Sequence, residues 1–188
     1  MIVISDTGPI ITLLKAGCIE LLKDIFGEVI IPVAVYEELI ATEGYDEEKK
    51  IIKDADYIWV NSSDVSEETK RIQVNACLDF GESAALALAE RLNPDYMLIE
   101  DAKARRYAEE QKINVIGSLA ILIMSYKKGL LSKEEVYNIT QKMKRSGRHI
   151  SEKLYLNIYK TIELEDKYIE KEISHIDDEN IVRREKSR

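Results

Sequence analysis

Several acidic residues of this chain stand where they could share one site. Ser5 and then Asp6 follow the apolar run 2–4, and Gly8 and Pro9 then indicate a turn into a helix. In an open parallel α/β sheet, ligands bind at the edge formed by the carboxyl ends of the strands. The other acids that fall at or near such an edge are Glu37 or Glu38, Glu82, Glu100 and Asp101.

These acids have a chemistry in common. Crowded carboxylates repel one another and raise each other's pKa unless a positive charge lies among them. Oxygen donors without histidine or cysteine suit Mg²⁺ or Mn²⁺ better than zinc. A site of this kind activates water and stabilises charge on a phosphate during hydrolysis.

Each acid also has a purely structural interpretation. Asp6 suits the cap of the helix that follows it. Asp79 and Glu82 have the spacing of a capping box. Periodicity does not choose between Glu37 and Glu38, either of which suits an ordinary exposed helix position. Likewise, Glu100 could simply precede a helix capped by Asp101. The joint placement of the acids favours a site.

The pattern of apolar residues predicts the elements that would position these acids. Short apolar or β-branched runs alternate with helical periodicity, which indicates βαβ units and a parallel sheet. Past Gly129 only helices are predicted. The expected strands are 2–4, 29–31, 57–60 (an edge strand), 96–99 and 114–116, and the expected helices are 12–15, 19–23, 32–41, 51–54, 66–78, 83–92, 102–111, 119–128, 132–146 and 151–173.

Composition narrows the functional class. The 188 residues carry a formal net charge of −8, which argues against a dedicated nucleic-acid binder but not against a nuclease with an acidic metal site. Cys18 and Cys77 match no metal or redox spacing, and His149 and His175 are the only histidines. No apolar stretch approaches the ~18 residues of a membrane span, and no signal peptide is evident, so we expect a cytoplasmic protein without a membrane partner.

Five segments in order resemble the PIN-domain nucleases, and more narrowly an uncharacterised prokaryotic subgroup similar to VapC-type toxins. They are MIVISDTGP (1–9), IPVAVYEEL (31–39), LDFGESAALALA (78–89), LIEDAKARRYA (98–108) and VIGSLAIL (115–122). The resemblance covers about residues 1–155. It implies a three-layer α/β/α fold around a parallel sheet, and a metal-dependent ribonuclease with an all-acidic Mg²⁺ or Mn²⁺ site.

The resemblance also assigns roles to residues. The family's acids fall on Asp6, Glu38, Glu82 and Glu100. The last is a departure, since this group usually has Asp there, and it leaves open whether Glu100 or Asp101 holds the metal. The resemblance also implies that Ser5 or Thr7 supports Asp6, as similar polar residues of the family support their first Asp.

Basic residues near the acids are candidates for holding RNA. Lys103, Arg105 and Arg106 follow the last acids on the next helix, where arginine could contact phosphate through two hydrogen bonds. A denser run extends from Lys142 to His149. The structural alternative is a solubilising helix face.

Two functions of different class remain open. The leading one is a metal-dependent endoribonuclease, acting as the toxin of a toxin–antitoxin pair with a small antitoxin protein as partner. The alternative is a catalytically inactive PIN-like module that binds RNA or protein. A phosphatase with Asp6 as nucleophile ranks lower, because haloacid-dehalogenase-like phosphatases usually have a second Asp where this chain has Gly8.

The last part of the chain raises the question of assembly. Residues 1–155 are expected to form the nuclease domain and 156–188 a charged helical extension or tail. Ile150, Leu154 and Ile158 share a stripe at helical spacing. Such a stripe would serve a homodimer if it stayed exposed, or the domain's own core if the helix packed back.

Overall fold

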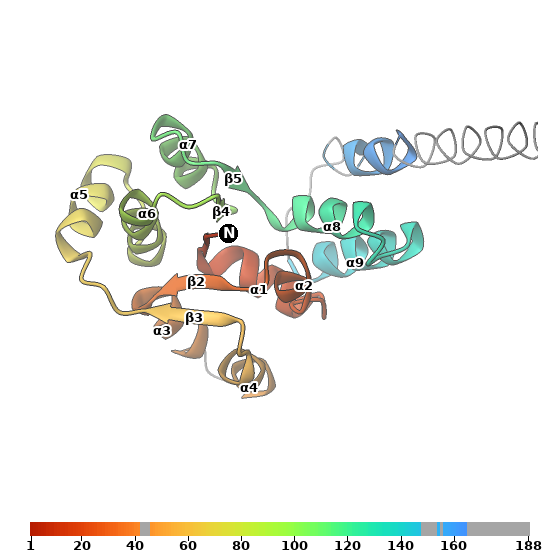
Figure 1. The fold of residues 1–188 in the computed structure, drawn as a ribbon, viewed down its shortest axis with the longest axis horizontal. Coiled ribbons are helices and arrows are strands. Elements are labelled where there is room, and N and C mark those ends of the chain that lie inside the picture. The colour runs from red at the N-terminus through yellow and green to blue at the C-terminus, as the bar shows by residue number, and fades with distance from the viewer. Residues whose placement is uncertain (42–45, 148–153, 155, 165–188) are drawn as a thin grey trace, which may run out of the picture.

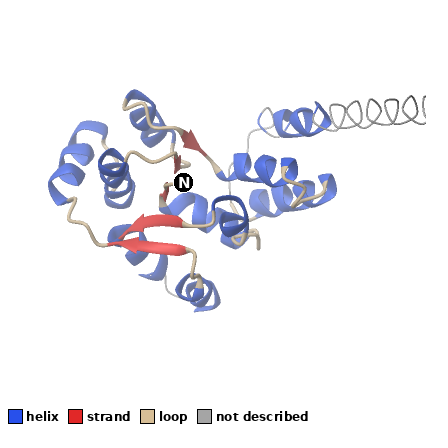
Figure 2. Ribbon diagram, viewed as in Figure 1, coloured by secondary structure: helices blue, strands red, loops and turns tan. Residues whose placement is uncertain are grey.

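The computed structural model describes residues 1–41, 46–147, 154 and 156–164. Within this part of the chain, five parallel strands form one sheet in the order β3-β2-β1-β4-β5 (Figure 1). Helices flank the sheet, which confirms the predicted three-layer α/β/α fold (Figure 2). The strands are β1 (Val3–Ser5), β2 (Val29–Pro32), β3 (Ile58–Asn61), β4 (Tyr96–Leu98) and β5 (Val115–Ile116).

Strand β1 lies at the centre of the sheet. All three of its residues are buried, which explains its run of apolar side chains without alternation. Ile4 aligns with Ile30 of β2 and with Met97 of β4. The backbone N–H of Asp6 donates to the carbonyl of Leu98 at 3.0 Å, so the chain leaves the sheet at Asp6 beside the end of β4.

The helices follow the predicted order, but the first and the fourth begin at Thr7 and Asp46, five residues before the predicted starts at 12 and 51. Among the described residues, no helix combines the length and the apolar character needed to cross a bilayer. The helices are α1 (Thr7–Lys15), α2 (Leu21–Phe26), α3 (Val33–Ala41), α4 (Asp46–Asp54), α5 (Ser66–Ala76), α6 (Phe80–Leu92), α7 (Ala102–Glu110), α8 (Ser118–Lys127) and α9 (Lys133–Arg145).

Helix α6 begins at Phe80 rather than at the predicted Ser83, and its cap explains the difference. The side chain of Asp79 accepts from the backbone N–H of Glu82 at 2.8 Å. The Glu82 carboxylate accepts in return from the backbone N–H of Asp79 at 3.2 Å. This capping box satisfies two orphan donors of the first turn and places Gly81 and Glu82 within the helix.

Strand β3 forms the edge of the sheet, as predicted. Its pairing with β2 leaves the other side of β3 without a neighbour in the sheet. Trp59 is 56% exposed and Val60 41% exposed. The strand therefore carries large apolar side chains at an open edge of the sheet.

The helical residues 156–164 pack on the end of the domain. Ile158 and Ile162 are buried in the same core as the sheet. The ring of Tyr159 meets that of Tyr137 of α9 edge to face, with centroids 5.9 Å apart. Of the predicted apolar stripe, Ile158 thus lies in the domain's own core, Leu154 is exposed, and Ile150 lies outside the described residues. The homodimer stays a prediction.

Candidate active site

Asp6 is both the cap of α1 and the most buried acid of this edge. Its Oδ1 accepts from the backbone N–H of Thr7 at 2.5 Å, so the capping interpretation is confirmed. The residue is nevertheless only 4% exposed. Behind it, the buried Ser5 hydroxyl donates to the Asp6 carbonyl at 2.8 Å. A cap alone does not require burial, because capping residues function well at the surface.

Glu38 reaches this site from α3. The Thr7 hydroxyl donates to Glu38 Oε2 at 2.6 Å. The other contact is with Gly81, where a Cβ would overlap the Glu38 carboxylate. The structure thus separates the two neighbouring glutamates that periodicity left open, since Glu38 contacts Thr7 and acts by its charge on Glu82, while the exposed Glu37 lines a separate pocket.

Glu100 reaches this site beside Gly8. A Cβ on Gly8 would lie 3.3 Å from Glu100 Cβ and 3.5 Å from Asp6 Oδ2, so both acids border the space beside Gly8. Glu100 Oε1 accepts from the backbone N–H and the hydroxyl of Ser118, at 2.9 and 2.5 Å. Ser118 therefore fixes the direction in which Glu100 points.

Asp101 has a different position. Its Oδ1 accepts from the backbone N–H groups of Lys103 and Ala104, at 2.7 and 2.9 Å, and so caps α7. Its charge still acts on Glu82. Glu100 therefore shares with Asp6 the space beside Gly8, while Asp101 caps α7 and acts on Glu82 by its charge.

Burial and like charges raise the pKa of two acids here. Burial, followed by the charges of Glu82 and Asp79, raises the pKa of Asp6 from 3.8 to about 7, against the lowering effect of the N–H of Thr7. Burial, followed by the charges of Asp79, Asp101 and Glu38, also raises the pKa of Glu82. Acids from four separate segments thus act on one another across one site.

The described acids are not arranged as a complete set of metal ligands. In the described ranges, no three Asp, Glu, His or Cys side chains are grouped closely enough to hold an ion together. Glu38, Glu82 and Glu100 instead accept hydrogen bonds from Thr7, Asp79 and Ser118. The donor chemistry nonetheless suits a hard divalent cation, because all the converging side chains offer oxygen.

The predicted RNA-contacting residues occupy two environments. Arg105 bends back, and its Nη1 donates to the Ile99 carbonyl at 3.0 Å beside Gly117. Lys103 and Arg106 are exposed on α7, and neither makes an ion pair with a described residue. Of the second basic run, Arg148 and His149 lie outside the described residues.

The sequence analysis missed Ser118. It follows Gly117 at the end of β5, the same kind of position that singled out Asp6 at the end of β1. A polar residue after any strand of a parallel sheet is a candidate for the site. Applied to all five strands, that rule would have found it.

Gly81 gives a test of this packing. We expect Gly81→Ala to change the free energy of unfolding by less than ~1 kcal/mol, because the overlapping group is the end of a flexible side chain and Ala favours the helix. It should displace Glu38 from Thr7 and lower any activity of the site. In a Glu38→Ala background the same change should be purely stabilising. Urea unfolding of the two single variants and the double variant measures this coupling, and additive effects would contradict it.

Comparison with known proteins agrees with this geometry. The sequence matches the family model for the PIN domain over residues 2–164. A search among curated proteins finds no match. PIN domains are generally nucleases, typically with divalent metals. The match spans the whole sheet and every acid described above, and the chain belongs to the PIN-domain family.

Proposed function

We propose that this protein is a metal-dependent endoribonuclease that hydrolyses phosphodiester bonds of RNA. The observation that carries the proposal is a buried acid, Asp6, at the carboxyl end of the central strand, with Glu100 on the other side of the space beside Gly8 and the charge of Glu82 acting on Asp6. The charge of Glu38 acts in turn on Glu82. Uncompensated carboxylates in such a place weaken the fold. A function that brings a cation explains why they are gathered.

Mg²⁺ or Mn²⁺ would be held by Asp6, Glu82 and Glu100, with Glu38 as a further acid. We favour Glu100 over Asp101, because Glu100 and Asp6 both border the space beside Gly8 while Asp101 caps α7. A cation there supplies an activated water and neutralises charge on the phosphate. It would also lower the pKa of Asp6.

The chain's own polar residues prepare this arrangement. Thr7 orients Glu38, Ser118 orients Glu100, and Ser5 fixes the backbone carbonyl of Asp6. Residues that hold such acids by hydrogen bonds commonly matter almost as much as the acids themselves.

The experiment is cleavage of single-stranded RNA by the purified full-length protein. We expect products with Mn²⁺ or Mg²⁺ and none with EDTA. Mn²⁺ should also raise the melting temperature, since an ion that binds only the folded state stabilises it. RNA binding without cleavage under any metal would replace the proposal with the alternative of an inactive binding module.

The exposed cations of α7 provide a second test. We expect Lys103→Glu combined with Arg106→Glu to weaken RNA binding about tenfold at low salt and to reduce the slope of log affinity against log salt by ~1–2. Lys50→Glu combined with Lys53→Glu on α4 is the control, because it reverses two exposed charges beside the opposite edge of the sheet. Fluorescence anisotropy across a salt series measures both. Equal effects of the two changes would place the RNA elsewhere.

The toxin role is the finer part of the proposal. It rests on the resemblance of the five segments to VapC-type toxins, and it implies a small antitoxin protein as partner. A small antitoxin-like reading frame beside this gene would support that role. Cleavage of RNA does not depend on it.

A further inference from the structure

A pocket adjoins the candidate active site. It has a volume of about 360 Å³ and opens between the start of α3, the loop 62–65 and the first turns of α5 and α6. Glu37 and Phe80 line it, and these residues are the chain neighbours of Glu38 and Gly81. The pocket and the acidic site therefore lie on either side of the contact between α3 and α6. Its size is at the lower end of the ~300–1,000 Å³ of small-molecule sites.

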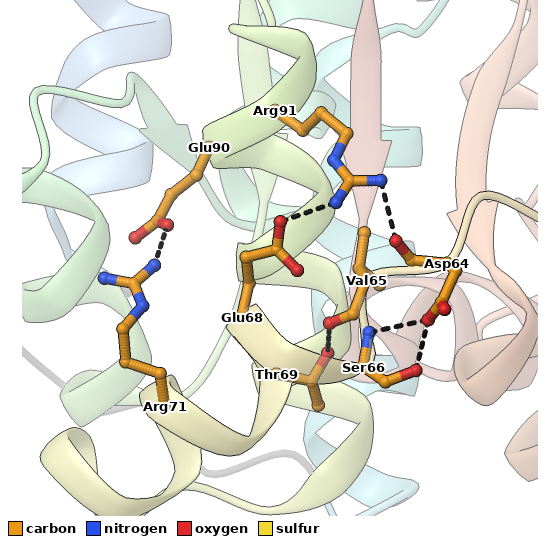
Figure 3. Close-up of polar contacts among 8 residues, drawn as sticks. All are labelled: Asp64, Val65, Ser66, Glu68, Thr69, Arg71, Glu90 and Arg91. Carbon is orange, nitrogen blue, oxygen red and sulfur yellow. Dashed lines mark hydrogen bonds and ion pairs between the residues drawn. The ribbon is translucent and has the colours of Figure 1, made fainter.

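The wall of this pocket is fixed by polar contacts (Figure 3). Arg91 donates to the Asp64 carbonyl at 2.7 Å and pairs with Glu68 at 2.5 Å. The Asp64 carboxylate accepts from the backbone N–H of Ser66 at 3.0 Å and from its hydroxyl. The loop is thus tied to both α5 and α6, and a preformed wall lowers the cost of ordering a ligand.

The lining indicates what the pocket would accept. Phe80 lines the pocket and is 55% exposed, so an aromatic side chain is accessible there. The exposed Glu37 makes no hydrogen bond or ion pair with the described residues. None of the described lining residues is a lysine or arginine, and Arg91, which contacts the loop, is occupied by Glu68. A phosphate has no counter-charge here, whereas a flat uncharged ring with N–H donors fits.

We propose that this pocket binds one nucleobase of the RNA, a base carrying an exocyclic amino group, next to the phosphate that is cleaved. The base stacks on Phe80 and donates its amino hydrogens to Glu37. Single-stranded RNA is recognised in this manner, by stacking on aromatic side chains and hydrogen bonds to base edges. The inference rests on the proposed function and adds base preference to it.

The direct test uses the full-length Asp6→Asn protein with Mn²⁺, so that RNA is not cut. The probe is a uridine pentamer with one central 2-aminopurine, a fluorescent base that carries an amino group. We expect quenching on binding, and about tenfold weaker binding after Phe80→Leu. Phe80→Tyr, which keeps the ring, should bind normally. Val74→Ala on α5 is the control, since Val74 is an exposed apolar residue away from the pocket lining, 79% exposed.

A second measurement addresses Glu37. We expect the Asp6→Asn protein to bind a pentamer with a central guanosine more tightly than a pentamer of uridine alone. Glu37→Gln should lower this ratio of affinities severalfold. Equal affinity for the two RNAs, or Phe80→Leu binding as tightly as the parent, would overturn the base pocket.

The outcomes separate the two proposals. In one outcome, the wild-type protein cleaves RNA with metal, and the rate depends neither on the RNA sequence nor on Phe80→Leu. That result would contradict the base pocket and support the nuclease. In the other outcome, the quenching depends on Phe80, but the wild-type protein cleaves no RNA with any metal. That result would contradict the nuclease and support the base pocket.

Discussion

Asp6→Asn is expected to lower the rate of metal-dependent RNA cleavage by a factor on the order of 10³ or more while leaving the fold intact. The substitution keeps the shape of the side chain and its acceptor for the Thr7 N–H, so α1 keeps its cap. It removes the negative charge of the buried acid that borders Gly8 together with Glu100 and on which Glu82 acts. Loss of one well-placed group commonly costs 10²–10³ in rate, and loss of a shared metal ligand costs more.

The measurement is the cleavage rate of single-stranded RNA at saturating Mn²⁺, with circular dichroism as the check on the fold. Glu109→Gln is a matched control, because it removes one carboxylate charge from an exposed position of α7. The control should cleave at the wild-type rate. Cleavage by pure Asp6→Asn protein as fast as by wild type would show that the activity lies elsewhere.

The same substitution should make the metal-free protein more stable at pH 8. Ionisation of Asp6 is opposed in the folded state, where its pKa is about 7, but not in the unfolded state, where it is near 3.8. The wild type therefore loses stability as the pH rises from about 4 to 7, and above that range the loss is complete. The two values set a ceiling of roughly 4 kcal/mol. We expect Asn, which never ionises, to gain about 2–4 kcal/mol.

Urea unfolding in EDTA at pH 8 and pH 3.5 measures this difference. Near pH 3.5 most of the gain should vanish, because Asp6 is then largely protonated in both states of the wild type. Adding Mn²⁺ at pH 8 should stabilise the wild type and not the variant. If Asp6→Asn gained the same stability at both pH values, the gain would not come from the buried charge of Asp6.

The sequence predicts the fold well because the buried strands leave a local signal. Ile4 and Met97 are fully buried in the middle of short apolar runs, and such runs identify central parallel strands. The order of the strands leaves no local signal. Ile4 pairs with both Ile30 and Met97, although Met97 lies far along the chain. That pairing depends on how the intervening helices pack.

The sequence predicts which segments contribute to the site, but not which side chain of each segment faces it. Asp6 can be identified from the sequence because no second acidic residue stands next to it at the end of its strand. Glu37 and Glu38 are both predicted to lie on the same helix, and only the close approach of Gly81 to Glu38 shows which of them faces the site. Glu100 and Asp101 differ in the same way, because successive side chains of an extended chain point in opposite directions. Choosing between neighbours requires contacts between distant segments.

The open edge of β3 has a consequence for spectroscopy. Trp59 is the only tryptophan of the chain, and it lies on that edge, 56% exposed. Its indole is already in contact with water in the native protein, so its emission changes little when the core melts. An unpaired strand edge is also where a second chain adds first. Tryptophan emission in this protein is therefore a poor measure of unfolding and a sensitive reporter of association through the edge of β3.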